Sequence, residues 1–208
     1  MAAKTTADAV ARQPSKLLSG LFRQVTPGKR LVVLEIGTAL PETVDFFADY
    51  RCRLHFVDLF SESFLREGRD ALDGEALRGA FEECLGLPED SRIDVCLLWD
   101  FLTFLDDRAL RAFNDVLTPW LHPGTKAHGF GVHHLAIRLE NVQYGIVDTE
   151  TLSVRPRATE PMAYHPHSQI EMADLFNNFA FDRGLLLPNG KLEMLLRSRI
   201  KADPEAQP

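Results

Sequence analysis

Leu31-Val-Val-Leu-Glu-Ile-Gly37 is the stretch of sequence that decides the fold. A nearly continuous apolar run of this length is typical of a strand that is buried on both faces in a parallel sheet. The glycine at its carboxyl end allows a sharp backbone turn and the close approach of a ligand. The stretch therefore predicts an α/β sheet with a ligand crevice at the carboxyl ends of its parallel strands.

A second apolar stretch, Leu54 to Asp58, supports this interpretation. Its last residue stands about 20 positions after Gly37, where nucleotide-binding α/β folds place an acid that hydrogen-bonds a ribose. A carboxylate there can accept hydrogen bonds from both hydroxyls of the sugar. We therefore expect an adenosine-containing ligand in the crevice with Asp58 as its ribose contact, and the alternative for Asp58 is an exposed loop acid.

The composition indicates one soluble globular domain. The chain has 208 residues, of which 45% are hydrophobic and 25% are charged, and this length allows a substantial core. A net charge of −7 argues against broad nucleic-acid binding. The three cysteines form no CxxC pair and suit a reducing compartment. With neither a membrane-spanning apolar run nor a signal peptide, we expect a cytoplasmic protein without a membrane partner.

Predicted helices and strands alternate along the chain. The patterns predict strands over 31–36, 53–59, 93–99 and 127–132, helices from Pro41, over 61–87 and from Asp106, a β-hairpin over 144–155, a helix from Ser168, and a terminal strand pair over 185–196. We expect a domain over 30–200 that carries a hairpin-and-loop insertion at 140–167. A helical arm at 1–29, with its helix over 7–24 or broken in two at Pro14, precedes it, and a disordered tail at 201–208 follows it.

Four segments in this order resemble the class I methyltransferases, which use S-adenosylmethionine. Glu35-Ile-Gly-Thr38 is similar to the cofactor turn of that family, and Asp58 matches its ribose-binding acid. The stretch 94–100, its following helix and the loop 121–124 are similar to the family's fourth strand, helix and loop. Residues 168–199 are similar to its last helix and closing hairpin.

This resemblance implies a three-layer Rossmann-like methyltransferase fold, with a mostly parallel sheet closed by an antiparallel terminal hairpin. It also implies S-adenosylmethionine as the cofactor. The cofactor-binding residues that it suggests are Glu35, Gly37, Thr38, Asp58 and Trp99. For Glu35 a purely structural role stays open, and for Trp99 so does packing in the core.

The candidate catalytic residues are Asp100 and His133, either of which would take a proton from the methyl acceptor. For Asp100 the alternative is the capping of a turn, and His165 or His167 could replace His133. We expect no metal site, because neither HExxH nor a helical pair of histidines is present.

Two departures from the family pattern bear on function. Ala39 and Pro41 stand where the family has further glycines, and the stretch between Asp58 and Ile93 predicts only helix, so the sheet is expected to lack one edge strand. We expect a methyltransferase that acts on an unidentified small molecule. The alternative is a catalytically inactive binding or scaffold protein of the same fold. The insertion at 140–167 is expected either to cover the acceptor or to form a homodimer arm.

Overall fold

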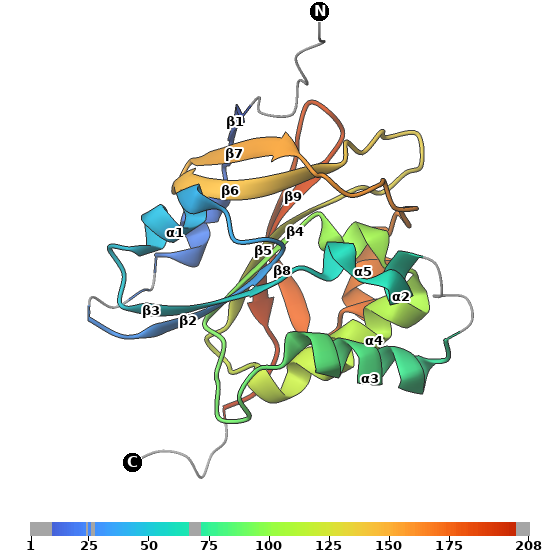
Figure 1. Ribbon diagram of the computed structural model, residues 1–208, viewed down its shortest axis with the longest axis horizontal. Helices are drawn as coiled ribbons and strands as arrows, with labels where there is room; N and C mark the ends of the chain where they lie inside the picture. Colours follow the sequence, from blue (N-terminus) through green and yellow to red (C-terminus); the bar gives the residue numbers. More distant parts are fainter. Residues whose placement is uncertain (1–9, 24, 26–27, 67–71, 203–208) are drawn as a thin grey trace, which may run out of the picture.

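The computed structural model describes residues 10–23, 25, 28–66 and 72–202. A six-stranded sheet with the order β3-β2-β4-β5-β9-β8 forms its centre (Figure 1). The first four strands are parallel, and β9 pairs antiparallel with both β5 and β8. The strands are β2 (Leu31–Ile36), β3 (Cys52–Val57), β4 (Val95–Trp99), β5 (Lys126–Gly131), β8 (Phe179–Leu186) and β9 (Leu192–Ser198). This arrangement confirms the predicted mostly parallel sheet with an antiparallel closing hairpin.

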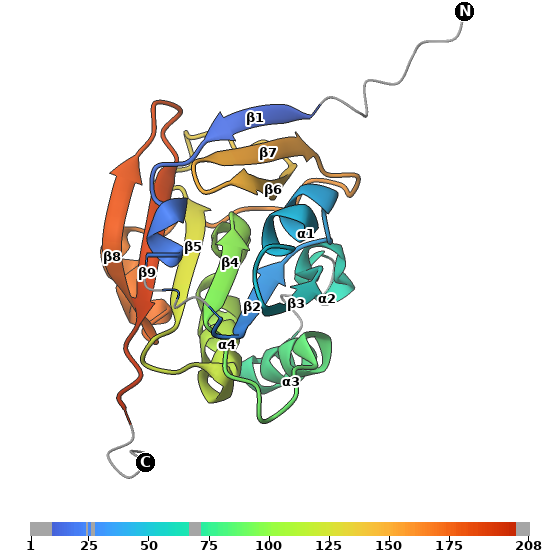
Figure 2. The same cartoon turned by 90° about the vertical axis from the view of Figure 1, so that its left-hand side faces the viewer.

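Helices cover both faces of this sheet, so the domain has three layers (Figures 1 and 2). One face carries α2 (Ser63–Arg66), α3 (Gly74–Leu85), α4 (Asp107–Leu117) and α5 (Gln169–Leu175). The opposite face carries α1 (Pro41–Phe47). The described residues also form short 3-10 helices: η1 (Leu18–Leu21), η2 (Leu59–Ser61), η4 (Phe101–Phe104) and η5 (Thr118–Trp120).

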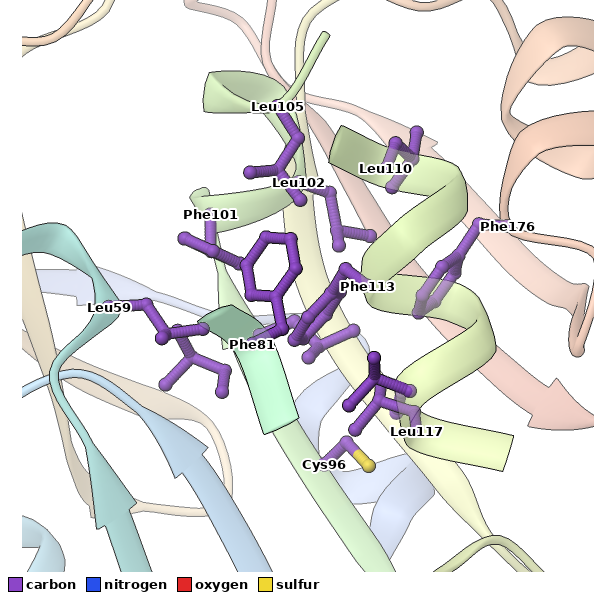
Figure 3. Close-up of a cluster of buried hydrophobic side chains, with 14 of the residues drawn as sticks. Leu59, Phe81, Cys96, Phe101, Leu102, Leu105, Leu110, Phe113, Leu117 and Phe176 are labelled. Carbon is purple, nitrogen blue, oxygen red and sulfur yellow. The ribbon is translucent and has the colours of Figure 1, made fainter. Parts of the chain in front are cut away.

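The alternation of side chains along each strand divides the core in two. Cys96 and Leu98 of β4 face the α3–α4–α5 layer, whereas Leu97 and Trp99 face the other side. In the first half, Phe113 of α4 packs against the rings of Phe81, Phe101 and Phe176 (Figure 3). Burial on both faces explains why β2 and β4 are apolar almost throughout.

A second, antiparallel sheet lies across the carboxyl ends of the parallel strands (Figures 1 and 2). Its strands are β1 (Ala11–Pro14), β7 (Thr151–Pro156) and β6 (Val142–Asp148), in the order β1-β7-β6. The hairpin predicted at 144–155 is therefore confirmed. Because this small sheet covers the edge where the ligand was expected, it decides what that edge can bind.

The helix predicted over 7–24 is wrong in the part of the arm that the structure describes. Ala11–Pro14 is a strand that pairs with β7, and only Leu18–Leu21 form a single turn of 3-10 helix. Pro14 cannot continue an α-helix, and pairing with an open strand edge satisfies the backbone groups of the segment instead. Residues 1–9, and with them the start of the predicted arm, lie outside the described residues.

The missing edge strand is confirmed for the described residues between β3 and β4, which hold only helices. The capping box at Ser168 is also confirmed, since its hydroxyl accepts from the Glu171 N–H and the Glu171 carboxylate accepts from the Ser168 N–H. Strand β8 begins at Phe179, earlier than predicted, because α5 ends at Leu175. Most of the predicted tail, 203–208, lies outside the described residues, among which no helix has the length and apolar character to cross a membrane.

Candidate functional site at the strand ends

Gly37, Asp58 and Asp100 directly follow three neighbouring parallel strands, β2, β3 and β4. Because the carboxyl ends of parallel strands meet at one edge, the structure brings these three predicted residues together. We call them the strand-end site. The prediction that these residues share one edge of the sheet is therefore correct. Whether a ligand can reach them depends on which side chains cover that edge.

The glycine turn has the backbone that the sequence indicates. Gly37 has a φ of +146°, which favours glycine, and no atom lies within 4 Å of the position that a β-carbon would take. Strand β6 of the small sheet contacts the residues that follow, of which Thr38 is exposed and Leu40 is buried. The Thr38 hydroxyl donates to the Gln143 side chain at 2.8 Å, and a β-carbon at Gly145 would lie 3.2 Å from Leu40. Strand β6 thus packs against the residues that follow the glycine turn.

The side chain of Arg157 occupies the strand-end site. It follows β7, is only 6% exposed, and its Nη2 lies 3.9 Å from Oδ1 of Asp100. The guanidinium carbon stands 3.4 Å from the centre of the Phe60 ring, and Nη2 donates to the Val142 carbonyl at 2.6 Å. A cation in contact with a ring, a carbonyl and a carboxylate therefore lies at the strand ends where the sequence predicts a nucleoside.

Asp100 is buried, with 1% of its surface exposed. Neither carboxylate oxygen has a hydrogen-bond partner among the described residues. Burial raises the pKa of Asp100 to about 6, while the charges of Arg157 and Lys191 act in the opposite direction. The protein covers this carboxylate almost completely, so a ligand cannot reach Asp100 in this arrangement.

Asp58 lies beside the same guanidinium. Its Oδ2 accepts a hydrogen bond from the Ser61 hydroxyl at 2.6 Å, and its Oδ1 is buried without a partner in the described chain. Burial lowers the pKa of Arg157, whereas the negative charges of Asp100 and Asp58 raise it. Asp58 thus helps to hold the arginine in its charged form.

Glu35 and Trp99 lie inside the core, where each of them packs against other side chains. The indole Nε1 of Trp99 donates to Oε1 of Glu35 at 3.1 Å, and the Trp99 ring stacks on Tyr144 with 5.5 Å between centroids. Trp99 has a φ of +47°, a strained conformation that these contacts hold in place. Burial raises the pKa of Glu35 to about 8, against the lowering effect of the Trp99 hydrogen bond, so this acid is neutral at pH 7.

His133 lies apart from the strand-end site. It is exposed after β5 and lines a cavity of about 260 Å³ between the end of β5, α5 and the β8–β9 hairpin. His167 lines the same cavity, and its Nε2 donates to the Leu105 carbonyl at 2.9 Å. The two candidate bases, the exposed His133 and the buried Asp100, are therefore not presented on one accessible surface.

Sequence reasoning missed a buried polar network on β5 and β9. Oε1 of Glu193 lies 3.0 Å from Nε2 of His128 and accepts hydrogen bonds from the Ser15 hydroxyl and the Leu17 N–H. Burial by itself would raise the pKa of Glu193, but the hydrogen bonds from these groups and from the Lys16 N–H lower it to about 2. An acid within the apolar run 192–196 was the available signal.

The described residues contain no group of three or more histidine, cysteine, aspartate or glutamate side chains that could hold a metal ion. The hydrogen bonds from Ser15, Lys16 and Leu17 to Glu193 hold the amino-terminal segment against β9.

No protein-family model matches the sequence, and no curated protein matches it either. Solved structures are similar to it in shape. The pyocyanin biosynthetic protein PhzM shares 15% identity over 86% of this chain and 55% of its own, with a TM-score of 0.44. This chain thus spans about half the length of PhzM.

Two further similar structures are methyltransferases. The 1,6-didemethyltoxoflavin-N1-methyltransferase of Burkholderia thailandensis, with bound S-adenosylhomocysteine, is 16% identical over 87% of this chain and 76% of its own (TM-score 0.46). The glycopeptide N-methyltransferase MtfA, in complex with S-adenosylmethionine, is 15% identical over 87% and 92% (TM-score 0.46). At these sequence identities and TM-scores, the similarity says nothing about the activity of this chain. The strand order of this chain gives the mostly parallel sheet with an antiparallel closing hairpin that the sequence resemblance predicts.

Proposed function

We propose that this chain is a methyltransferase-fold binding protein that does not transfer methyl groups, because its own Arg157 side chain occupies the donor position. The observation that carries the proposal is the burial of this guanidinium beside Asp100. The cation takes the place of a ligand, since it contacts the Phe60 ring, lies beside the catalytic candidate Asp100, and is under the electrostatic influence of Asp58, the predicted ribose contact.

The surroundings of Arg157 support a permanent closure. Its backbone N–H donates to the Asn141 carbonyl at 2.9 Å, so the residue is fixed to the strand that precedes the β6–β7 turn. The same hairpin is held to α1 by an ion pair between Arg155 and Glu42 and by the hydrogen bond from the Ile146 N–H to the Thr43 hydroxyl. Opening the site would break all of these contacts together.

Calorimetry with S-adenosylmethionine and S-adenosylhomocysteine tests the proposal. We expect no heat of binding with the wild-type protein at high micromolar ligand. Arg157→Ala is the informative variant, because it removes the occupant. Arg155→Ala is its matched control, since that arginine lies two residues away within β7 but pairs with Glu42. Micromolar binding of either ligand by the wild-type protein would overturn the proposal.

The second candidate function is an S-adenosylmethionine-dependent methyltransferase that acts on a small molecule. The open space at Gly37 and the unpartnered Oδ1 of Asp58 favour it. In this case Asp58 would hold the ribose, Gly37 and Thr38 would border the methionine end, and Asp100 or His133 would accept a proton. The wild-type protein would then bind S-adenosylhomocysteine, and Asp58→Ala would weaken that binding by ~1–3 kcal/mol.

A further inference from the structure

The cavity between the end of β5, α5 and the β8–β9 hairpin has a lining distinct from the strand-end site. Its walls include the side chains of Met172, Phe181, Leu192 and Met194, and none of the lining residues is a lysine, arginine, aspartate or glutamate. Thioethers and an aromatic ring favour contact with a flat, polarizable molecule. A cationic ligand would lose its hydration there without gaining a carboxylate partner, and an anionic ligand would find only the imidazoles of His133 and His167.

One buried polar group points to a specific ligand. Thr103 lines the cavity and is 1% exposed. The backbone holds it in place, because its N–H donates to the Asp100 carbonyl and its carbonyl accepts from the His165 N–H at 2.7 Å. A hydroxyl in the wall of a cavity can form one directional hydrogen bond with a polar group of a bound molecule.

The size of the cavity limits the ligand further. An apolar protein cavity of about 150 Å³ accommodates benzene, so the cavity of about 260 Å³ has room for a molecule of two fused rings. Leu186 and Gln169 line it and are exposed, so the cavity opens to solvent between β8 and α5.

From these observations we infer that the cavity binds a small, uncharged aromatic molecule that carries one hydroxyl or N–H group, which bonds to the Thr103 side chain. The inference rests on the proposed function, for which it names the class of ligand. The binding site is formed by the end of β5, the 3-10 helix η4, the start of α5 and the β8–β9 hairpin, and it requires no opening of the Arg157 closure.

Methionine-methyl NMR of the wild-type protein tests the inference with 2-naphthol as the probe. The chain has four methionines, of which Met172 and Met194 line the cavity and Met162 does not. We expect saturable shifts of the Met172 and Met194 methyl signals, with Met162 unchanged. Naphthalene-2-sulfonate, which has the same rings and a charge, should bind at least tenfold more weakly. No saturable shift at Met172 and Met194, or equal binding of the two probes, would overturn the inference.

Two variants test the same contacts by fluorescence titration. A β-carbon at Gly131 would lie 3.3 Å from the Met194 methyl and 4.0 Å from the Thr103 hydroxyl, so Gly131→Ala fills the cavity and should weaken 2-naphthol at least tenfold. Thr103→Val keeps the shape and removes one hydrogen bond, which should weaken it about fivefold. Gly79→Ala, on the exposed side of α3 with no atom within 4 Å of the new carbon, is the matched control and should bind as the wild type does.

Unchanged affinity in Gly131→Ala would overturn the site, and unchanged affinity in Thr103→Val would overturn the hydroxyl contact. A thermal unfolding transition establishes that each variant is folded, and the wild-type NMR titration tests the inference even if a variant does not fold. The outcomes also separate the two proposals. Binding of S-adenosylhomocysteine overturns the proposed function, whereas failure of 2-naphthol to bind overturns only the ligand class.

Discussion

The guanidinium of Arg157 and the carboxylate of Asp100 lie 3.9 Å apart in the interior, although the two residues are 57 positions apart in the sequence and follow strands of different sheets. Burial raises the pKa of Asp100 to about 6 from an ordinary value of 3.8, so ionising it in the folded state costs free energy. The stability that the protonated acid contributes is complete below pH 3.8 and is lost as the pH rises through 6. The positive charge of Arg157 favours the ionised form of Asp100 and so reduces this loss of stability.

The first prediction concerns this pair. Arg157→Met should lower the free energy of unfolding by about 3 kcal/mol at pH 8, where Asp100 is left as a buried charge with its nearest cation removed. The loss should be smaller at pH 5, where the acid is mostly protonated. Urea unfolding at both pH values measures the difference. Adding Asp100→Asn should recover much of the loss at pH 8, and an equal loss at both pH values would contradict the assigned pairing.

The second prediction concerns Glu35, whose pKa burial raises to about 8 from 4.5. Its contribution to stability is complete below pH 4.5 and is lost as the pH rises through 8, by ~5 kcal/mol in total. Glu35→Gln keeps an oxygen that accepts from the Trp99 indole and removes the titration. Thermal unfolding between pH 6 and 9 should therefore show a smaller loss of stability in the variant. A parallel loss in both proteins would mean that Glu35 is not the titrating group.

The third prediction concerns Glu193, which gathers hydrogen bonds from Ser15, His128 and two backbone N–H groups. Glu193→Gln should cost at least ~2 kcal/mol, because an amide NH₂ cannot accept the bonds that a carboxylate does and would face other donors. Chemical denaturation at pH 7 measures the cost. Ser15→Ala removes one donor only and should cost less, so a larger effect of Ser15→Ala would exclude the carboxylate as the centre of the network.

The fourth prediction compares two threonines that bind β6. Thr43 is buried and its hydroxyl accepts from the Ile146 N–H at 3.1 Å, whereas Thr38 is exposed and donates to the Gln143 side chain. Thr43→Val should cost ~1–3 kcal/mol because it leaves a buried N–H without a partner. The same change at Thr38 should alter stability by no more than about 0.5 kcal/mol, since water replaces the lost bond. Equal effects in equilibrium unfolding would show that the contact with Thr43 does not hold the hairpin.

Local patterns determined the central sheet and the positions of its strand ends. The apolar runs before Gly37 and Asp100 had to be buried on both faces, and their directions follow from the connecting helices, so Gly37, Asp58 and Asp100 could be placed on one edge from sequence. The capping residues Asp106 and Ser168 were equally readable, because each acts on backbone groups only three residues away. These signals involve residues only a few positions apart, so they can be recognised in the sequence without knowledge of the tertiary structure.

Only the tertiary structure decided what lies on that edge. The sequence left open whether the insertion at 140–167 covers the acceptor or forms a dimer arm. Nothing near Arg157 indicates that its side chain is buried beside Asp100, or that residues 11–14 pair with β7 instead of forming a helix. Strand pairing and the burial of a cation depend on partners far away along the chain, whose free-energy contributions no local pattern encodes. The sequence by itself therefore determined where a ligand site would be built in this fold, and the long-range packing of one arginine determined that the site is closed.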